Sequence, residues 1–439
     1  MAASLHHRKL SRALATRSAA TLSAVAIAAS FSAYFAMYAF RKPFAAGAYS
    51  DQHVFGLELK LALVIGQVLG YTLSKFVSIK WVSELARDRR GLALVGIVSA
   101  AEVALLGLGT LPPAGMVLAM LLNGLPLGAV WGLVFSYLEG RRTSGLLGAG
   151  LSTSYIVASG AVKHVGRSLV QAGVPEPWMP ALVGMLFMPI FVAAVVVLEA
   201  LPAPSTEDMQ ARSRRTPMSG AVRLGFLRGY LPGLLALTML YVLLTVYRDF
   251  RDNFAVEIWH DLGFGDTPAL LSAAELPAAL ISMAAVALLV MVRSNRAALL
   301  AVHAMMLLGV LSIAGATWLH ELGAISGIVW MVSVGAGLYL AYVPFNCMLF
   351  DRLMAATRST GTAVFMIFVT DASGYAGSVL LLLYKNFGAP KMQFLAFFTV
   401  LSHLTAVGCA LGFLFSGAYF FRRTRPAAVP RGSAPPSLV

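Results

Sequence analysis

Cysteine is almost absent from this sequence, which holds only Cys347 and Cys409 in 439 residues. Both lie within or beside apolar stretches, so neither a disulfide framework nor a CxxC metal pair is available, and we interpret them as packing residues. The eight histidines are scattered, and no Gly-Lys-Ser/Thr follows a glycine-rich stretch. These absences argue against an enzyme and against an ATP-driven machine. We predict no catalytic residues, no metal and no cofactor.

Charge is also scarce. Asp, Glu, Lys and Arg make up 12% of the residues, whereas soluble domains have about 25%; 59% are apolar and the mean hydropathy is +0.78. A helix needs about 20 apolar residues to cross a membrane. Twelve stretches reach that length and predict an all-α integral membrane protein of twelve transmembrane helices. They begin near Ala19, Leu59, Gly91, Ala114, Gly145, Trp178, Tyr230, Pro268, Ala297, Gly323, Thr360 and Gln393.

The formal net charge of +14 indicates topology rather than nucleic-acid binding. Basic residues gather before the first span, in every second connection and after the last span, for example at Arg8, Arg141, Arg293 and Arg422. By the positive-inside rule both termini are cytoplasmic, which requires an even number of spans. We predict a multi-pass protein of the plasma membrane, and the short loops fit a bacterial inner membrane. Its expected partners are lipids and a small molecule, with no nucleic acid.

Only one connection is both long and polar, and it divides the spans six and six. We predict an N-terminal six-helix bundle at residues 1–200, a cytoplasmic linker at 201–224 and a C-terminal six-helix bundle at 225–423. Residues 424–439 contain too little apolar surface to fold alone and predict a disordered cytoplasmic tail.

Two short repeats indicate that the bundles are duplicates. The pattern FRxxFA occurs at Phe40–Ala45 and again at Phe250–Ala255, 210 residues later. Thr143-Ser144-Gly145 opens the fifth predicted span, and Ser359-Thr360-Gly361 opens the eleventh. Matches at nearly equal offsets, on equivalent spans, predict two pseudo-symmetric halves with a substrate site between them near the midplane.

With these features the chain resembles the major facilitator superfamily, and within it the organophosphate/phosphate antiporter branch. The segment Tyr34–Ala45 is similar to that branch's tyrosine-rich segment ending in Arg-Lys-Asn-Phe-Ala, and Gly70–Phe76 is similar to its Tyr-Gly-Phe-Ser-Lys-Phe segment. The resemblance implies a secondary transporter that works by alternating access.

The sequence departs from the family pattern in two places. The signature Gly-x-x-x-Asp-Arg after span two remains only as Glu84–Gly91. The branch's functional histidine in span five is replaced here by Ser154 or Tyr155, and His164 lies further along. Phosphate antiport therefore does not carry over whole. Because the signature is weakened, an alternative stays open: a transporter-like membrane sensor or assembly factor that transports no substrate.

The repeated arginines Arg41 and Arg251 are the first candidates for a ligand site, because a guanidinium stays charged and binds phosphate or carboxylate in a bidentate manner. An arginine inside a span is functional by default. If the first helix is straight from Ala19, however, Arg41 lies about 33 Å along it, where snorkelling to the outer surface would explain it equally well.

The seventh span carries further charges whose pairing decides which arginine is free. Arg248 and Asp252 stand four apart on one helical face, so we predict that they pair and leave Arg251 for the ligand. Asp249 is an alternative partner for Arg251 in the unloaded site.

Lys75, in the second span, is predicted to add a third positive charge, with snorkelling to the cytoplasmic surface as its alternative. Lys163 and His164 in the fifth span carry the same ambiguity. Tyr38 and Tyr155 are predicted to line the cavity, together with Tyr34, Trp131, Tyr342 and Asn346.

Three carboxylates within spans, Glu102, Glu275 and Asp371, need a partner or a proton. Asp371, in the eleventh span, matches Tyr155 under the repeat and is predicted to face the cavity. Asp371, Glu275 and Asp249 are the candidates for proton coupling or internal counter-charge. Glu102, on a peripheral span, is the weakest candidate.

These features predict a secondary active transporter for a small organic or phosphorylated anion, functional as a monomer. An unloaded site with uncompensated cations is costly to reorient, which favours anion exchange. A carboxyl proton carrier favours proton symport instead, and the sequence leaves both mechanisms open.

Overall fold

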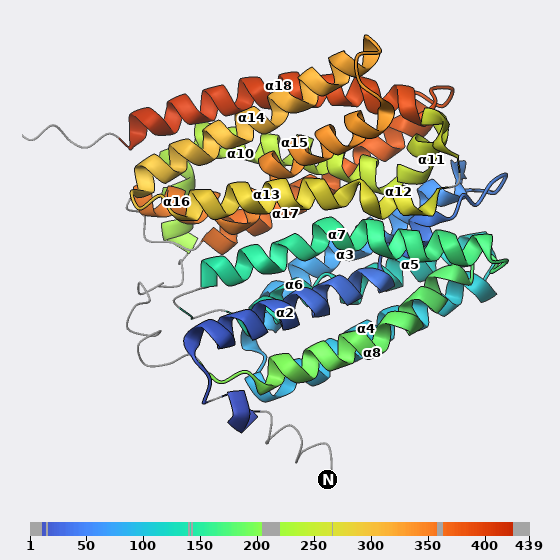
Figure 1. Cartoon of the computed structure of the whole chain (residues 1–439), viewed down its shortest axis with the longest axis horizontal. Helices are drawn as coiled ribbons and strands as arrows, with labels where there is room; N and C mark the ends of the chain where they lie inside the picture. The colour runs from blue at the N-terminus through green and yellow to red at the C-terminus, as the bar shows by residue number, and fades with distance from the viewer. Residues whose placement is uncertain are drawn as a thin grey trace, which may run out of the picture.

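The computed structural model describes residues 11–14, 16–138, 141, 144–203, 220–265, 267–357 and 363–424. Twelve long helical segments form two groups of six (Figure 1). The first group is α2 (Ala19–Met37), α3 (Leu59–Glu84), α4 (Arg90–Thr110), α5 (Pro113–Leu127) continued by α6 (Val130–Phe135), α7 (Ser144–Gln171) and α8 (Met179–Ala200). The second group is α10 (Gly220–Asn253), α12 (Pro268–Ala273) continued by α13 (Glu275–Val290), α14 (Asn295–Glu321), α15 (Gly327–Cys347), α17 (Ala363–Phe387) and α18 (Phe394–Arg423).

Short elements connect these helices. They are η1 (Tyr38–Phe40), η2 (Pro43–Ala46), the hairpin of β1 (His53–Val54) and β2 (Leu57–Glu58), η3 (Arg87–Arg89), α11 (Ala255–Trp259), η4 (His260–Phe264) and α16 (Leu349–Ala356). Most of the predicted linker, the tail from residue 425 onward and residues 143 and 359–361 of the second repeat lie outside the described residues.

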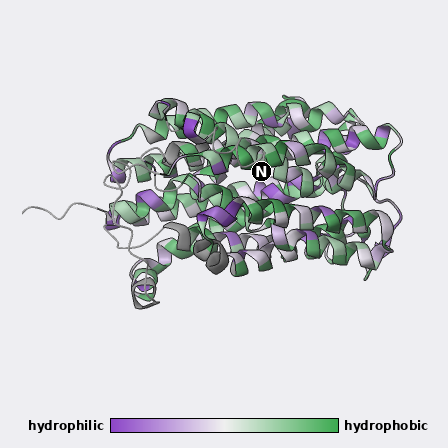
Figure 2. Cartoon of the chain, turned by 90° about the horizontal axis from the view of Figure 1, so that it is seen from below, coloured by the Kyte–Doolittle hydropathy of each residue, from purple (hydrophilic) through white to green (hydrophobic). Residues whose placement is uncertain are grey.

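The predicted all-α membrane fold is confirmed. Ten of the helices in the described part of the chain are long and apolar enough to cross a membrane. The other two long helices, α3 and α7, have 26 and 28 residues, which is also sufficient length. Hydrophobic residues predominate along the helices (Figure 2), and many leucines on their outer faces are exposed, as expected for surfaces that meet lipid.

The start of α2 and the end of α18 lie at the same end of the bundle, on the left in Figure 1. We call the opposite end, where α2 ends and α3 begins, the outer end, because the distribution of basic residues predicts that it faces away from the cytoplasm.

Both copies of the repeated motif lie where a long helix breaks. Helix α2 ends at Met37 and a single 3₁₀ turn leads to Arg41, whereas α10 ends at Asn253 and Phe254 leaves the helical region before α11. Arg41 therefore does not extend a straight helix to the membrane surface. Arg41 is 5% exposed, which excludes the snorkelling alternative in this conformation.

Two buried amides satisfy the backbone at the first break. Gln67 on α3 donates to the Arg41 carbonyl and to Asn123 Oδ1, both at 2.8 Å. Asn123 on α5 donates to the carbonyls of Phe40 (2.9 Å) and Ala101 (3.0 Å). A Cβ at Gly124 would lie 2.2 Å from the Gln67 carbonyl, so close packing of α3 against α5 requires glycine there. The sequence thus builds a rigid support for Arg41.

Candidate functional site

A cavity of about 50 Å³ lies between the two halves. It receives side chains from α2, α3, α6 and α7 of the first half and from α10, α15 and α17 of the second. Tyrosine is the commonest residue in its wall. The lining residues are Tyr34, Tyr38, Arg41, Tyr71, Lys75, Trp131, Tyr155, Arg248, Tyr342, Asn346, Ile367, Asp371 and Tyr375.

Arg41 lines this cavity, and its guanidinium contacts aromatic rings and no carboxylate among the described residues. Its guanidinium carbon lies 3.9 Å from the centroid of the Tyr71 ring and 5.9 Å from those of Tyr38 and Tyr375. Among the described residues, no carboxylate is within ion-pair distance of Arg41, and its buried Nε has no hydrogen-bond partner. Burying a charge without a counter-ion costs free energy, and a bound anion would lower that cost at Arg41.

Lys75 and Asp371 form an ion pair across the interface, with Nζ 3.2 Å from Oδ2. The Tyr241 hydroxyl, on α10, donates to the other oxygen of Asp371 and lies 2.7 Å from the Tyr342 hydroxyl. Lys75 is 6% exposed, so its predicted alternative of snorkelling is excluded in this conformation. This pair joins the two halves at the cavity wall.

The predicted pairing within α10 was wrong. Arg248 pairs with Asp249 at 2.7 Å and donates to Tyr342, and it lines the cavity. Arg251 instead pairs with Glu275 at 2.6 Å and donates to the Met331 carbonyl. Neither Arg251 nor Glu275 lines this cavity.

The reason is the helical register. Arg248 and Arg251 are three residues apart, so their side chains leave α10 in directions that differ by about 60°. The face that carries Arg251 meets α13 and α15 of the same half, and the face that carries Arg248 meets the other half. The repeat therefore aligns Arg41 with an arginine that is paired inside its own half.

Asp252 is shared between two lysines of the first half. Lys42 Nζ lies 2.5 Å from one carboxylate oxygen and Lys163 Nζ lies 2.7 Å from the other, to which Ser159 also donates. Lys42, Ser159 and Asp252 line a smaller adjoining cavity of about 20 Å³, whose wall includes Arg41, Tyr155 and Arg248 as well.

The charges around the two cavities do not balance. Five cations face three carboxylates, and Arg41 is the cation without a carboxylate partner among the described residues. Positive charge therefore exceeds negative charge at the interface of the halves, which favours an anionic ligand. The cations are Arg41, Lys42, Lys75, Lys163 and Arg248, and the carboxylates are Asp249, Asp252 and Asp371.

Further contacts between the halves lie toward the outer end. Lys60 pairs with Glu257, and His164 Nδ1 lies 3.0 Å from the Ser272 hydroxyl. A Cβ at Gly160 on α7 would lie 2.0 Å from the Leu271 carbonyl on α12, so the helices touch there. The two halves are thus closed against each other at this end.

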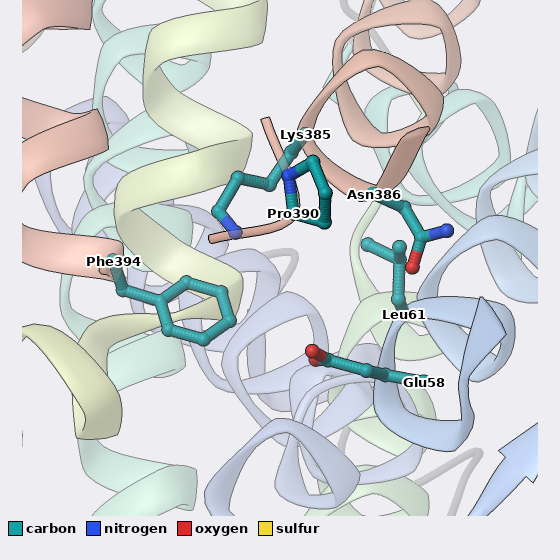
Figure 3. A pocket seen from close by; sticks show the side chains of 6 residues that line it. All are labelled: Glu58, Leu61, Lys385, Asn386, Pro390 and Phe394. Carbon is teal, nitrogen blue, oxygen red and sulfur yellow. The ribbon is translucent and has the colours of Figure 1, made fainter. Parts of the chain in front are cut away.

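A third pocket, of about 20 Å³, opens between the halves at the outer end (Figure 3). Lys385 lies in it with Nζ 4.9 Å from the centroid of the Phe394 ring, and Glu58 of the hairpin faces it from the first half. Asn386 donates to the Gly56 carbonyl at 3.2 Å, so the hairpin contacts the end of α17.

The opposite end of the first half has its own hydrogen-bond network. Arg87 donates to the Leu201 carbonyl at 2.6 Å, and Glu199 accepts from the Gly91 amide (2.9 Å) and the Tyr137 hydroxyl (3.0 Å). Burial raises the pKa of the Tyr137 phenol, and the Glu199 carboxylate raises it further, so the hydroxyl remains a donor. The weakened signature Glu84–Gly91 therefore still connects α4 to α8.

Several predicted residues lie elsewhere, and several cavity residues were missed. Glu102 is buried against Gly184 away from the cavity, and its oxygens have no partner among the described residues. Tyr71, Tyr241 and Tyr375 were not predicted for the site. The only signal for Tyr71 and Tyr375 was position, since each lies four residues from Lys75 or Asp371.

Nothing in the described part of the chain is arranged as a metal centre, since no three His, Cys, Asp or Glu side chains gather there.

The arrangement matches a known architecture. The chain resembles the crystal structure of a D-xylose-proton symporter, with a TM-score of 0.58 and 12% identity over 90% of this chain and 96% of that one. The protein thus is a multi-pass membrane protein with the major facilitator fold. By its sequence it belongs to the family of unknown function DUF5690, which it matches over residues 43–423. No curated protein sequence matches it. The resemblance to the organophosphate branch stays a prediction.

Proposed function

We propose that this protein is a secondary active transporter for a small organic or phosphorylated anion, which it moves by alternating access. The observation that carries the proposal is Arg41, a buried guanidinium without a counter-ion among the described residues, at a cavity between the two halves. Transporters of the major facilitator type bind their substrates between two such halves near the midplane, which supports the proposal.

In this proposal Arg41 and Arg248 contact the anionic group, and Lys75 assists. The tyrosine rings of the cavity wall provide apolar faces and hydroxyl groups for the rest of the molecule. Arg251, paired with Glu275, has a structural role.

Besides the Lys75–Asp371 pair at the cavity, several contacts between the halves lie toward the outer end, so the protein in this conformation is closed on that side. Opening to the outside separates Asp252 from Lys42 and Lys163, and Lys60 from Glu257. The proposed cycle alternates this closed outer end with a closed inner end, around a fixed site.

A thermal-shift screen of the detergent-solubilised protein tests the site. The compounds are phosphate, glycerol phosphate, hexose phosphates, dicarboxylates, nucleosides and neutral sugars. A compound at one hundred times its Kd stabilises the folded protein by about 2.7 kcal/mol. We expect stabilisation by an anion that Arg41→Gln and Arg248→Gln abolish. Arg352→Gln, which removes a partly exposed arginine that donates to Asn295, is the control. Stabilisation by neutral compounds alone would overturn the proposal.

A further inference from the structure

Asp371 depends on a single cation. Among the described residues, Lys75 is the one basic group within ion-pair distance of it, and Tyr241 donates the second contact. Asp371 is 9% exposed. The titratable and charged groups around it are Lys75 and Tyr71 on α3, Tyr241 and Arg248 on α10, Tyr342 on α15 and Tyr375 on its own helix α17.

Lys75 is also within reach of whatever Arg41 binds. The guanidinium of Arg41 and the ammonium of Lys75 contact the same ring, at 3.9 and 5.2 Å from the centroid of Tyr71. An oxyanion held by Arg41 therefore lies beside Lys75 and competes with Asp371 for its N–H groups.

We propose that the anion displaces Asp371 from Lys75 and that Asp371 then takes up a proton, which makes the protein an anion–proton symporter. This inference rests on the proposed anion site and goes beyond it by naming the coupling ion and the residue that carries it. A carboxylate that loses its cation in a buried site binds a proton instead of keeping its charge.

Each contact that breaks when the anion binds is replaced by another. The contact between the Lys75 ammonium and Asp371 breaks, and a contact between that ammonium and an oxygen of the anion forms. One proton moves from water to an oxygen of Asp371. A monoanion and a proton together leave the net charge of the site unchanged, so the loaded site is no more costly to reorient than the unloaded one. Loss of the contact between Lys75 and Asp371 also releases one link between the halves.

Sulfate is the probe, because it is a small oxyanion that does not buffer near neutral pH. Binding is measured by thermal shift against sodium chloride of equal ionic strength. Proton uptake is measured in the same weakly buffered solution with a pH indicator. We expect the wild-type protein to take up about one proton for each sulfate bound. Asp371→Asn, which removes the competitor, is expected to bind sulfate about tenfold more tightly or better and to take up no proton.

Two further variants separate the outcomes. Lys75→Gln is expected to weaken sulfate binding and to abolish proton uptake, because Asp371 is then protonated before the anion arrives. Glu321→Gln, which removes an exposed carboxylate that contacts His403, is expected to behave as wild type. If Asp371→Asn does not fold, the proton uptake of the wild-type protein and of Lys75→Gln still tests the proposal.

Sulfate binding without proton uptake in the wild-type protein would overturn the symport mechanism and leave the anion site standing. Unchanged affinity in Asp371→Asn would also overturn it. Absence of sulfate binding in every variant would overturn the anion site itself.

Discussion

The side chains of Lys75 and Asp371 lie 3.2 Å apart across the interface of the two halves. One comes from α3 and the other from α17, so the contact exists only while the halves are together at this depth. It lies in the wall of the same cavity as Arg41, which has no carboxylate partner among the described residues. Asp371 of the second half thus neutralises Lys75, whereas the charge of Arg41 remains available for a ligand.

Arg248 and Arg251 are expected to respond differently to substitution. Arg251→Gln leaves Glu275 without its partner in a buried site and should destabilise the fold by about 3–5 kcal/mol. The double variant Arg251→Gln/Glu275→Gln should recover much of this loss. The measurement is the thermal midpoint in detergent, together with the stabilisation caused by an anion.

The same variants test the assignment of the site. Anion stabilisation should survive in the double variant and disappear in Arg248→Gln. Retention in Arg248→Gln with loss in the double variant would mean that the sequence repeat, and not the helical register, identifies the binding arginine.

Asp252→Asn should open the outer end. It leaves Lys42 and Lys163 facing each other without their shared carboxylate, and like charges repel. The reporter is a cysteine at His164, in a protein with Cys347→Ser and Cys409→Ser, labelled with a membrane-impermeant maleimide. We expect a faster labelling rate in Asp252→Asn. An unchanged rate would mean that these ion pairs do not hold the halves together.

Gly160→Leu tests the same closure by packing instead of charge. The Leu271 carbonyl occupies the space that any side chain at Gly160 would need. The substitution should therefore force α7 away from α12 and accelerate labelling of the cysteine at His164. Gly225→Leu, at a glycine with open space around it, should leave the rate unchanged. Equal rates in the two glycine variants would contradict close contact of the halves at Gly160.

Asn123→Leu should impair the site without touching the cavity. It removes the donors to the Phe40 and Ala101 carbonyls and leaves Gln67 with one partner fewer. Each buried polar group without a partner costs about 1–3 kcal/mol. The thermal midpoint should fall, and anion stabilisation should fall further, because the break that aims Arg41 loosens. A lower midpoint with unchanged anion stabilisation would limit Asn123 to a packing role.

The fold was predictable because it rests on composition and length. Apolar stretches of sufficient length specify helices that cross a membrane, and eleven of the twelve predicted starts lie within about four residues of the observed helix starts. The seventh differs, because α10 begins at Gly220 and is kinked at Tyr230, where the prediction began.

The site was predictable only in part. A charged residue within a predicted span is a candidate site residue by its position alone, and this criterion identified Arg41, Lys75 and Asp371. Their partners depend on helical register and on contacts between distant helices, which a single sequence does not encode locally. The prediction therefore paired Arg248 with Asp252, whereas Asp252 binds Lys42 and Lys163 from the other half. Tyr241 was missed because a tyrosine in an apolar stretch is usually a packing residue.

Uptake into proteoliposomes tests the central claim most directly. The purified protein is reconstituted, and the entry of phosphate, glycerol phosphate, hexose phosphates, dicarboxylates, nucleosides and neutral sugars is followed for the wild-type protein, Arg41→Gln and the control Arg352→Gln. The account predicts that the wild-type protein and the control move at least one anion and that Arg41→Gln does not. Transport of neutral compounds alone, or equal anion transport by Arg41→Gln, would contradict it.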